Sequence, residues 1–232
     1  WRGGDPGPNE HDSSFNQEWV HLLVQPKGNP GRRGPGNFGQ AEGGFGPEMG
    51  FARTLLDAQP DRPLAIVKVA YNATGVSAWR PGTSIYRTLI SETNLAIEKA
   101  KAQGITLRPR AFLWCQGETD SNRNPDTDAY RDELESIIST LRKDLDAPEM
   151  IALLGFNTRF GKRASKRSEP RWENQRIINA QKQIAENSDY AVWVNDWGVE
   201  IANQAHFSAK GTLEVGERYA KALLEAEANL KR

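Results

Sequence analysis

The sequence predicts an α/β fold, a three-layer α/β/α sandwich built on a five-stranded parallel sheet. Five short apolar runs lie far enough apart along the 232 residues to leave room for helices between them. Runs that are apolar on both faces are typical of buried parallel strands. Most of the other segments carry apolar residues three or four positions apart, as amphipathic helices do. Alternation of strand and helix favours a doubly wound sheet, and the length fits one domain.

Each expected element follows from one of these patterns. Strands are expected at Trp19–Val24, Leu64–Ala70, Ala111–Trp114, Met150–Gly155 and Tyr190–Val194. Helices are expected at Ser84–Gln103, Asp126–Leu145, 171–186 and 208–230. Residues 1–18 are polar, contain glycine and proline and show no apolar period. They are expected to form an irregular arm ahead of a domain at residues 19–232.

Charge and composition exclude several classes of function. Thirty Lys and Arg residues balance thirty Asp and Glu residues, so no global field attracts nucleic acid or an anionic membrane. No apolar run approaches the ~20 residues of a membrane-spanning helix. Cys115 is the only cysteine, which excludes an internal disulfide and a cysteine-based zinc cluster. Residues 34–39 (GPGNFG) fit a dinucleotide-binding pattern but open no helix, so no dinucleotide cofactor is expected. No metal is expected either.

Ligands of doubly wound sheets bind beyond the carboxyl ends of the strands, so the residues just after each strand are the candidates. The run WCQGETD (114–120) leaves the third expected strand with three polar side chains around a glycine: Gln116, Glu118 and Asp120. An amide and two carboxylates at this edge indicate a site. The alternative is a turn in which these side chains only satisfy loop N–H groups.

His206 is the candidate general base. Of three histidines, His11 lies in the arm and His21 lies within the first expected strand. His206 follows the last strand and precedes a helix that Ser208 can cap. Its side-chain chemistry suits proton transfer near neutral pH. The alternative is a histidine at a helix start without a catalytic task.

Four blocks of the chain resemble a known family, the carbohydrate O-acetylesterase branch of the SGNH hydrolases, which includes acetylxylan and sialate acetylesterases. The blocks are FGPEMGFA (45–52), IVKVAYNATGVSAW (66–79), WCQGETD (114–120) and NQAHFSAKGTLEVGERYA (203–220). They occur in the family's order, and the resemblance covers roughly residues 19–225. It implies a flavodoxin-like SGNH fold and an acetylated carbohydrate as substrate. It also favours secretion, although the sequence itself leaves the compartment and the oligomeric state open.

The resemblance assigns roles to four residues. His206 matches the base that takes the serine proton and returns it to the leaving alcohol. Gln116 matches the side-chain donor of the oxyanion hole, and the N–H near Ala73 matches the second donor where the family usually has glycine. Asn203 occupies the family's aspartate position, where an amide orients imidazole without stabilising the imidazolium.

Three further residues are expected near the substrate or the loops around it. An exposed Trp79, or Trp114 in its place, would flank a sugar ring. Glu118 is also a substrate-binding candidate, although it and Asp120 are expected mainly to brace the loop.

The serine nucleophile of the family's G-Q-S-N block is missing from its expected place. Gly28 occupies the serine position if Asn29 is kept in register, and Lys27 occupies it if the count runs from the strand without a gap. No Ser, Thr or Cys occurs from Trp19 to Arg53. Lys27 would bind an anionic substrate or act as a base if strongly desolvated, and the plainer alternative is a solvated loop lysine.

Two alternatives to an active esterase therefore stay open. One is a catalytically silent carbohydrate-binding or scaffold domain that kept the fold and lost the nucleophile. The other is that residues 25–29 differ from those of the natural chain. Without an oxygen nucleophile, the unaltered chain is expected to hydrolyse p-nitrophenyl acetate no faster than a His206→Ala variant.

Overall fold

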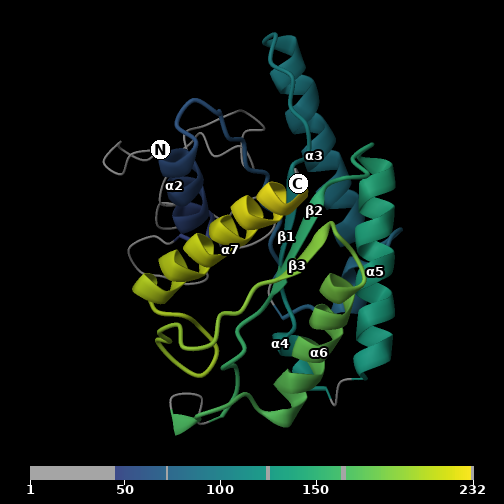
Figure 1. Ribbon diagram of the computed structural model, residues 1–232. Coiled ribbons are helices and arrows are strands. Elements are labelled where there is room, and N and C mark those ends of the chain that lie inside the picture. The colour runs from purple at the N-terminus through teal and green to yellow at the C-terminus, as the bar shows by residue number, and fades with distance from the viewer. Residues whose placement is uncertain (1–44, 72, 124–125, 163–165, 231–232) are drawn as a thin grey trace.

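The computed structural model describes residues 45–71, 73–123, 126–162 and 166–230. These residues form five longer helices around a small sheet, together with a 3₁₀ turn and a short helix (Figure 1). In chain order the elements are α2 (Glu48–Ala58), the 3₁₀ turn η1 (Val76–Trp79), α3 (Ser84–Ala102), β1 (Ala111–Cys115), α4 (Glu118–Ser121), α5 (Thr127–Asp144), β2 (Ile151–Gly155), α6 (Trp172–Glu186), β3 (Ala191–Trp193) and α7 (Ala209–Leu230).

The sheet is parallel, with strand order β1-β2-β3. Ala111 pairs with Ile151 at the start of β1, and Leu153 of β2 pairs with Val192. All five residues of the central strand β2 are buried. The third, fourth and fifth apolar runs therefore form parallel strands, as the sequence predicts.

The prediction of five strands is not borne out in the described part of the chain, where the sheet has three. Residues 64–70 form no strand there, although Leu64 and Ile66 pack partly buried against the core. A strand needs a neighbour that supplies backbone partners, and in the flavodoxin-like order 2-1-3-4-5 that neighbour would be Trp19–Val24. This first run and the arm at residues 1–18 lie outside the described residues.

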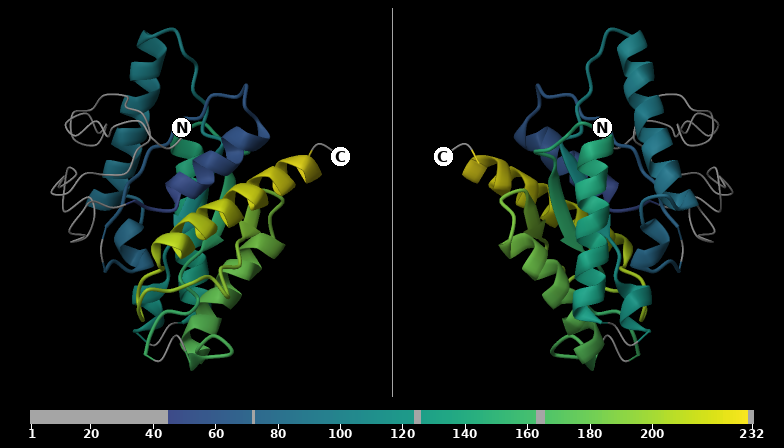
Figure 2. Two further views of the ribbon diagram at one scale, coloured as in Figure 1. Left: turned by 90° about the vertical axis from the view of Figure 1, so that its left-hand side faces the viewer. Right: turned by 90° about the vertical axis from the view of Figure 1, so that its right-hand side faces the viewer.

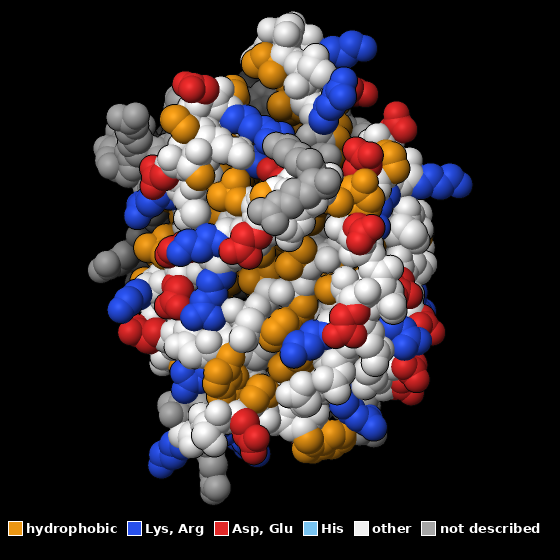
Figure 3. Space-filling view, in the orientation of Figure 1, with side chains coloured by type: hydrophobic (Ala, Val, Ile, Leu, Met, Phe, Trp, Pro, Cys, Tyr) orange, Lys and Arg blue, Asp and Glu red, His pale blue; other side chains and the backbone are white. Residues whose placement is uncertain are grey.

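Helices cover both faces of the sheet (Figure 2). Ile151 and Leu153 of β2 point into a cluster with Leu55 of α2 and Val215 of α7. Ala152 and Leu154, which alternate with them, point into the opposite cluster, which holds the buried faces of α5 and α6. Alternate side chains of a strand point to opposite faces, so an apolar β2 is needed to fill both cores. Figure 3 shows charges of both signs interspersed over one face of the molecule, in keeping with the balanced composition.

Side-chain caps mark the starts of three of the four expected helices. The Thr83 side chain accepts a hydrogen bond from the Tyr86 N–H at α3, and Asp126 accepts one from Ala129 N–H at α5. Ser208 Oγ accepts from the Gly211 N–H at α7, as its position predicts. Caps of this type satisfy N–H groups that have no partner within the helix. The sequence prediction missed α2 and the short α4.

Candidate active site

The loops that leave the carboxyl ends of the strands gather at the lower end of the view in Figure 1, with α4 and the start of α6. Three loops matter most. They begin at Gln116 after β1, at Phe156 after β2 and at Val194 after β3. Apart from Trp114 in β1 and the residues of the 73–79 segment, the candidate residues that the structure describes lie on the chain segments that begin with these loops.

Gln116 joins the loop after β1 to the 73–76 segment. Its side chain is 9% exposed, and its Nε2 donates to the carbonyl oxygen of Thr74 at 3.0 Å and to Asp120 Oδ2 at 2.5 Å. The two expected oxyanion donors, the Gln116 amide and the Ala73 N–H, therefore belong to neighbouring segments. Because both Gln116 N–H groups have acceptors here, a bound oxyanion would have to share or displace one of these bonds.

Asp120 holds the same two segments together. Its carboxylate accepts the Val76 N–H at 3.1 and 3.2 Å to its two oxygens. Gly75 permits this close approach, because a Cβ added there would lie 2.9 Å from Asp120 Oδ1. Burial raises the pKa of Asp120, and the hydrogen bonds from Gln116 and Val76 oppose that rise. Asp120 is thus a bracing residue rather than a group presented to a ligand.

Ala73 adopts a backbone conformation that glycine normally supplies. Its φ is +54°, in the left-handed region that costs an L-residue roughly 1–2 kcal/mol. The residue is exposed. Ala73 therefore adopts left-handed backbone angles at the position where the family resemblance places a glycine.

Glu118 ties the loop after β1 to the loop after β2. Its Oε1 accepts the Asn157 N–H at 2.9 Å, and its Oε2 accepts the Gly117 N–H at 3.1 Å. Burial raises the pKa of Glu118, and these backbone hydrogen bonds oppose that rise. With its oxygens directed at backbone N–H groups, Glu118 braces the site, which argues against its use in substrate binding.

His206 lies on a tight hairpin between β3 and α7. Ile201 and Phe207 form an antiparallel bridge, and the Ala202 N–H donates to the His206 carbonyl oxygen at 2.9 Å. Asn203 Oδ1 accepts the N–H groups of Ala205 and His206, each at 2.9 Å, and lies 3.1 Å from His206 Nδ1. An amide oxygen facing Nδ1 selects the tautomer with hydrogen on Nδ1, which leaves the Nε2 lone pair for a proton.

Asn157, which the sequence interpretation did not single out, connects this hairpin to the rest of the site. It is 2% exposed, and its Nδ2 donates to the Ala205 carbonyl oxygen at 3.3 Å while its backbone N–H donates to Glu118. Two bonds at one residue therefore link the loops that carry Gln116 and His206. Its position directly after a predicted buried strand was the signal that could have identified it.

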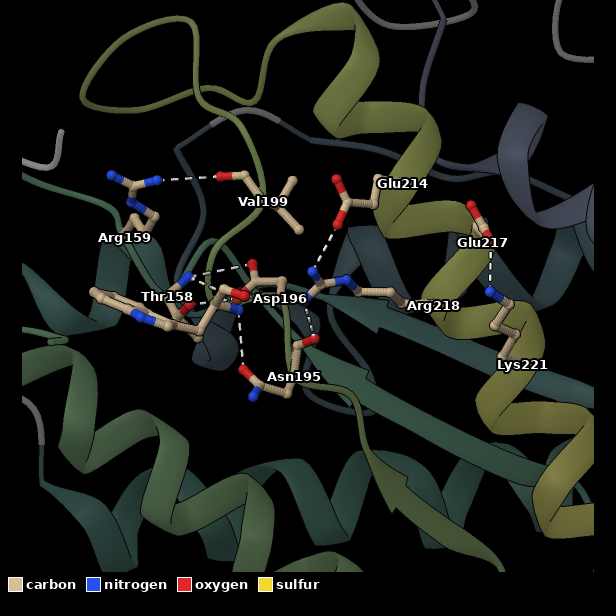
Figure 4. Close-up of polar contacts among 10 residues, drawn as sticks. Thr158, Arg159, Asn195, Asp196, Val199, Glu214, Glu217, Arg218 and Lys221 are labelled. Atoms are coloured by element: carbon tan, nitrogen blue, oxygen red, sulfur yellow. Dashed lines mark hydrogen bonds and ion pairs between the residues drawn. The ribbon is translucent and has the colours of Figure 1, made fainter. Parts of the chain in front are cut away.

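Asp196, on the loop after β3, is a second buried residue that the sequence interpretation missed. It accepts hydrogen bonds from both the N–H and the hydroxyl of Thr158. Burial raises its pKa to about 7, the bonds from Thr158 oppose the rise, the charge of Glu118 adds to it, and Arg218 weakens it. Figure 4 shows Asp196 facing Thr158, with Arg218 bonded to the carbonyl oxygen of neighbouring Asn195. Asp196 thereby fixes the loop that carries Asn157.

Comparison with known proteins gives the family. The family model described as carbohydrate esterase, sialic acid-specific acetylesterase, matches residues 17–225. The chain belongs to this carbohydrate esterase family.

Similarity to individual proteins is more limited. A probable carbohydrate esterase of Arabidopsis thaliana, At4g34215, is 28% identical over 109 residues, which are 46% of this chain and 40% of that protein. The matched segment thus spans about two fifths of the relative's length. The crystal structure of an Arabidopsis thaliana protein, AT4G34215, superimposes with a TM-score of 0.63 at 22% identity, covering 81% of this chain and 71% of that one. This likeness supports the fold.

The expectation that an exposed Trp79 or Trp114 flanks a sugar ring is wrong. Trp79 is 8% exposed and Trp114 is 3% exposed. Their rings meet edge to face at 5.5 Å, and Nε1 of Trp79 donates to Thr74 Oγ1 at 3.1 Å. Both indoles thus fill the core between η1 and α5, where burying their large apolar area is more favourable than exposing it. Lys27 and Gly28 lie outside the described residues.

Two general expectations can be checked only in the part of the chain that the structure describes. There, no three His, Cys, Asp or Glu side chains gather as metal ligands do. No helix of that part has the length and apolar character needed to cross a membrane.

Proposed function

We propose that the chain carries the site of a carboxyl-ester hydrolase that acts on acetylated carbohydrate. The observation that supports this best is the Asn203–His206 pair, on a hairpin that Asn157 joins to the loop of Gln116. A base with its orienting partner and a polarising amide are held on separate loops at one edge of the sheet. These are the groups that acyl transfer requires beside a nucleophile.

The proposed chemistry follows from these groups. With a hydroxyl nucleophile in place, its oxygen attacks the acetyl carbonyl carbon while His206 Nε2 accepts the hydroxyl proton. The negative charge that forms on the carbonyl oxygen is stabilised by the Gln116 amide and the Ala73 N–H. The intermediate collapses, and His206 returns the proton to the sugar oxygen, which leaves as an alcohol. Water then repeats the sequence on the acyl-enzyme and releases acetate.

Two missing groups, the nucleophilic hydroxyl and the carboxylate beside His206, limit the rate of this reaction. Neither Gly28 nor Lys27 supplies a hydroxyl at the position that the family resemblance gives to serine. Asn203 orients His206 but carries no charge to stabilise the imidazolium, a replacement that costs about 10⁴ in turnover in a well-studied serine protease. Oxyanion donors alone leave slow hydrolysis by water. We therefore expect low turnover by the unaltered chain. The family match favours an esterase over a silent binding domain.

Substrate class is tested with a Gly28→Ser, Asn203→Asp variant, which restores both missing groups. Acetate release is measured from acetylated xylo-oligosaccharide and from ethyl acetate, a small ester without a sugar. We expect kcat/KM to be at least about tenfold higher for the sugar ester, because contacts to the rings lower the barrier. Equal kcat/KM values for the two esters would show that the site does not recognise carbohydrate and that the repaired variant is a general esterase.

A further inference from the structure

Trp172, the first residue of α6, is an exposed indole without an assigned role. It is 57% exposed, more than Ile105 at 50% and Leu230 at 41%, the other large apolar side chains exposed in the described residues. The buried tryptophans Trp79 and Trp114 contrast with it. A tryptophan exposed to this extent leaves a large apolar ring in water, and such surfaces often serve binding.

Arg176, one helical turn further along α6, contacts this ring. Its guanidinium carbon lies 5.2 Å from the centroid of the Trp172 ring, within the range of a cation–π contact. Arg176 is itself exposed. The pair therefore combines a flat apolar surface with a charged group that can donate paired hydrogen bonds to a carboxylate. Sugar rings stack on such indole faces through their C–H groups.

The start of α6 lies beside the candidate active site. Arg171 donates through Nη2 to Asn122 Oδ1 at 3.2 Å and to Ser121 Oγ at 3.4 Å, at the end of α4. Because α4 begins two residues after Gln116, this contact fixes Trp172 at the same carboxyl edge of the sheet. A long ligand reaching this edge is therefore within the neighbourhood of α6.

The chain segment that leads into α6 is rich in basic residues. Between residues 159 and 176 the sequence has seven basic residues and two acidic ones, within a chain whose charges balance overall. Lys162, Lys166 and Arg167 of this stretch are exposed. A local excess of this kind attracts anionic ligands and weakens with added salt.

We propose that Trp172 and Arg176 form a second sugar-binding subsite, which takes a carboxylate-bearing sugar unit of the same acetylated polysaccharide. The apolar face of the pyranose ring stacks on the indole, and the sugar carboxylate pairs with the Arg176 guanidinium. The proposal rests on the proposed function for the identity of the polymer. The subsite itself binds without any chemical step.

Calorimetric titration of the full chain tests the subsite, with tetragalacturonate as the charged probe and xylotetraose as the neutral one. We expect the unaltered chain to bind tetragalacturonate more tightly, by a margin that shrinks with salt. Trp172→Ala weakens binding of both probes by about tenfold or more, since stacking is lost. Arg176→Gln weakens only tetragalacturonate. Ile105→Ala, which removes another exposed apolar side chain before β1, leaves both affinities unchanged.

Two results would overturn the subsite: no binding of tetragalacturonate by the unaltered chain, or equal binding by Trp172→Ala and Ile105→Ala. Neither depends on catalysis, so failure of the esterase proposal leaves this measurement valid. The converse also holds. If adding Trp172→Ala to the repaired variant leaves its KM for acetylated sugar unchanged, the esterase proposal stands and the subsite proposal is wrong.

Discussion

Burial raises the pKa of Asp196 to about 7. In the unfolded chain the carboxyl group ionises at its ordinary value. Between about pH 4 and 7 the folded protein therefore holds a proton that the unfolded chain has lost, so the stability contributed by this group falls as pH rises. Glu118 and Asp120, whose pKa values are also raised, change stability in the same direction.

Asp196→Asn separates the contribution of this one residue. Asparagine keeps an oxygen that accepts from Thr158 and does not titrate. The melting temperature of the unaltered chain is expected to fall more between pH 5 and pH 7.5 than that of the variant, because only the former must ionise or hold a buried carboxyl group. Melting curves by circular dichroism at the two pH values measure this. If the melting temperature falls equally in the two proteins, a group other than Asp196 causes the pH dependence. Arg218 and Glu118 are present in both proteins, so they do not account for a difference between them.

At the scale of elements, α2 and α7 cross with almost no room between their backbones. A Cβ added to Gly216 of α7 would lie 2.0 Å from the Pro47 carbonyl oxygen and 2.6 Å from the Phe51 nitrogen. Backbone atoms yield less readily than the end of a flexible side chain. The crossing therefore depends on a glycine at this position, because it allows α7 to seat Val215 and Tyr219 in the core.

Gly216→Ala is expected to lower the free energy of unfolding by roughly 1–3 kcal/mol, although alanine is the better helix former. Urea unfolding followed by circular dichroism measures the change. Lys221→Ala is the control on the same helix, where an exposed ion pair with Glu217 is worth about 0.3–0.5 kcal/mol. A Gly216→Ala variant as stable as this control would show that the two helices separate without cost.

For the whole molecule, the sequence predicts what local patterns determine. The apolar runs that became β1, β2 and β3 are recognisable because central strands are buried on both faces. Thr83, Asp126 and Ser208 mark helix starts because a cap needs only a side chain and the next turn. Helix α2 was missed because Pro47 and Gly50 near its start obscure its apolar face, which includes Phe51 and Leu55.

Features of the site that depend on distant contacts were less predictable. The burial of Trp79 depends on packing against Trp114. The raised pKa of Asp196 depends on its burial and on the charge of Glu118, which the sequence alone does not show. The run at 64–70 has the composition of a strand, but pairing depends on a second segment. Gln116 and His206 were singled out because they follow strands, and both lie on loops at the carboxyl edge of the sheet, where parallel strands gather such residues. Their catalytic roles stay predictions.

The central claim is that His206 is placed to activate a hydroxyl nucleophile, and that this chain lacks the hydroxyl because residue 28 is glycine. Removing one member of a catalytic group often makes removal of the others cost little, so His206 should matter only after repair. Initial rates of p-nitrophenyl acetate hydrolysis are compared for the unaltered chain, His206→Ala, the Gly28→Ser, Asn203→Asp variant and that variant with His206→Ala. Melting curves confirm that all four are folded.

We predict equal slow rates for the first two proteins, a rise of roughly 10² or more in the repaired variant, and a return to the slow rate when His206 is then removed. An inert repaired variant, or one insensitive to His206→Ala, would contradict the account. So would a rate of the unaltered chain that depends on His206, which would point to a different nucleophile such as the exposed Ser77 in η1.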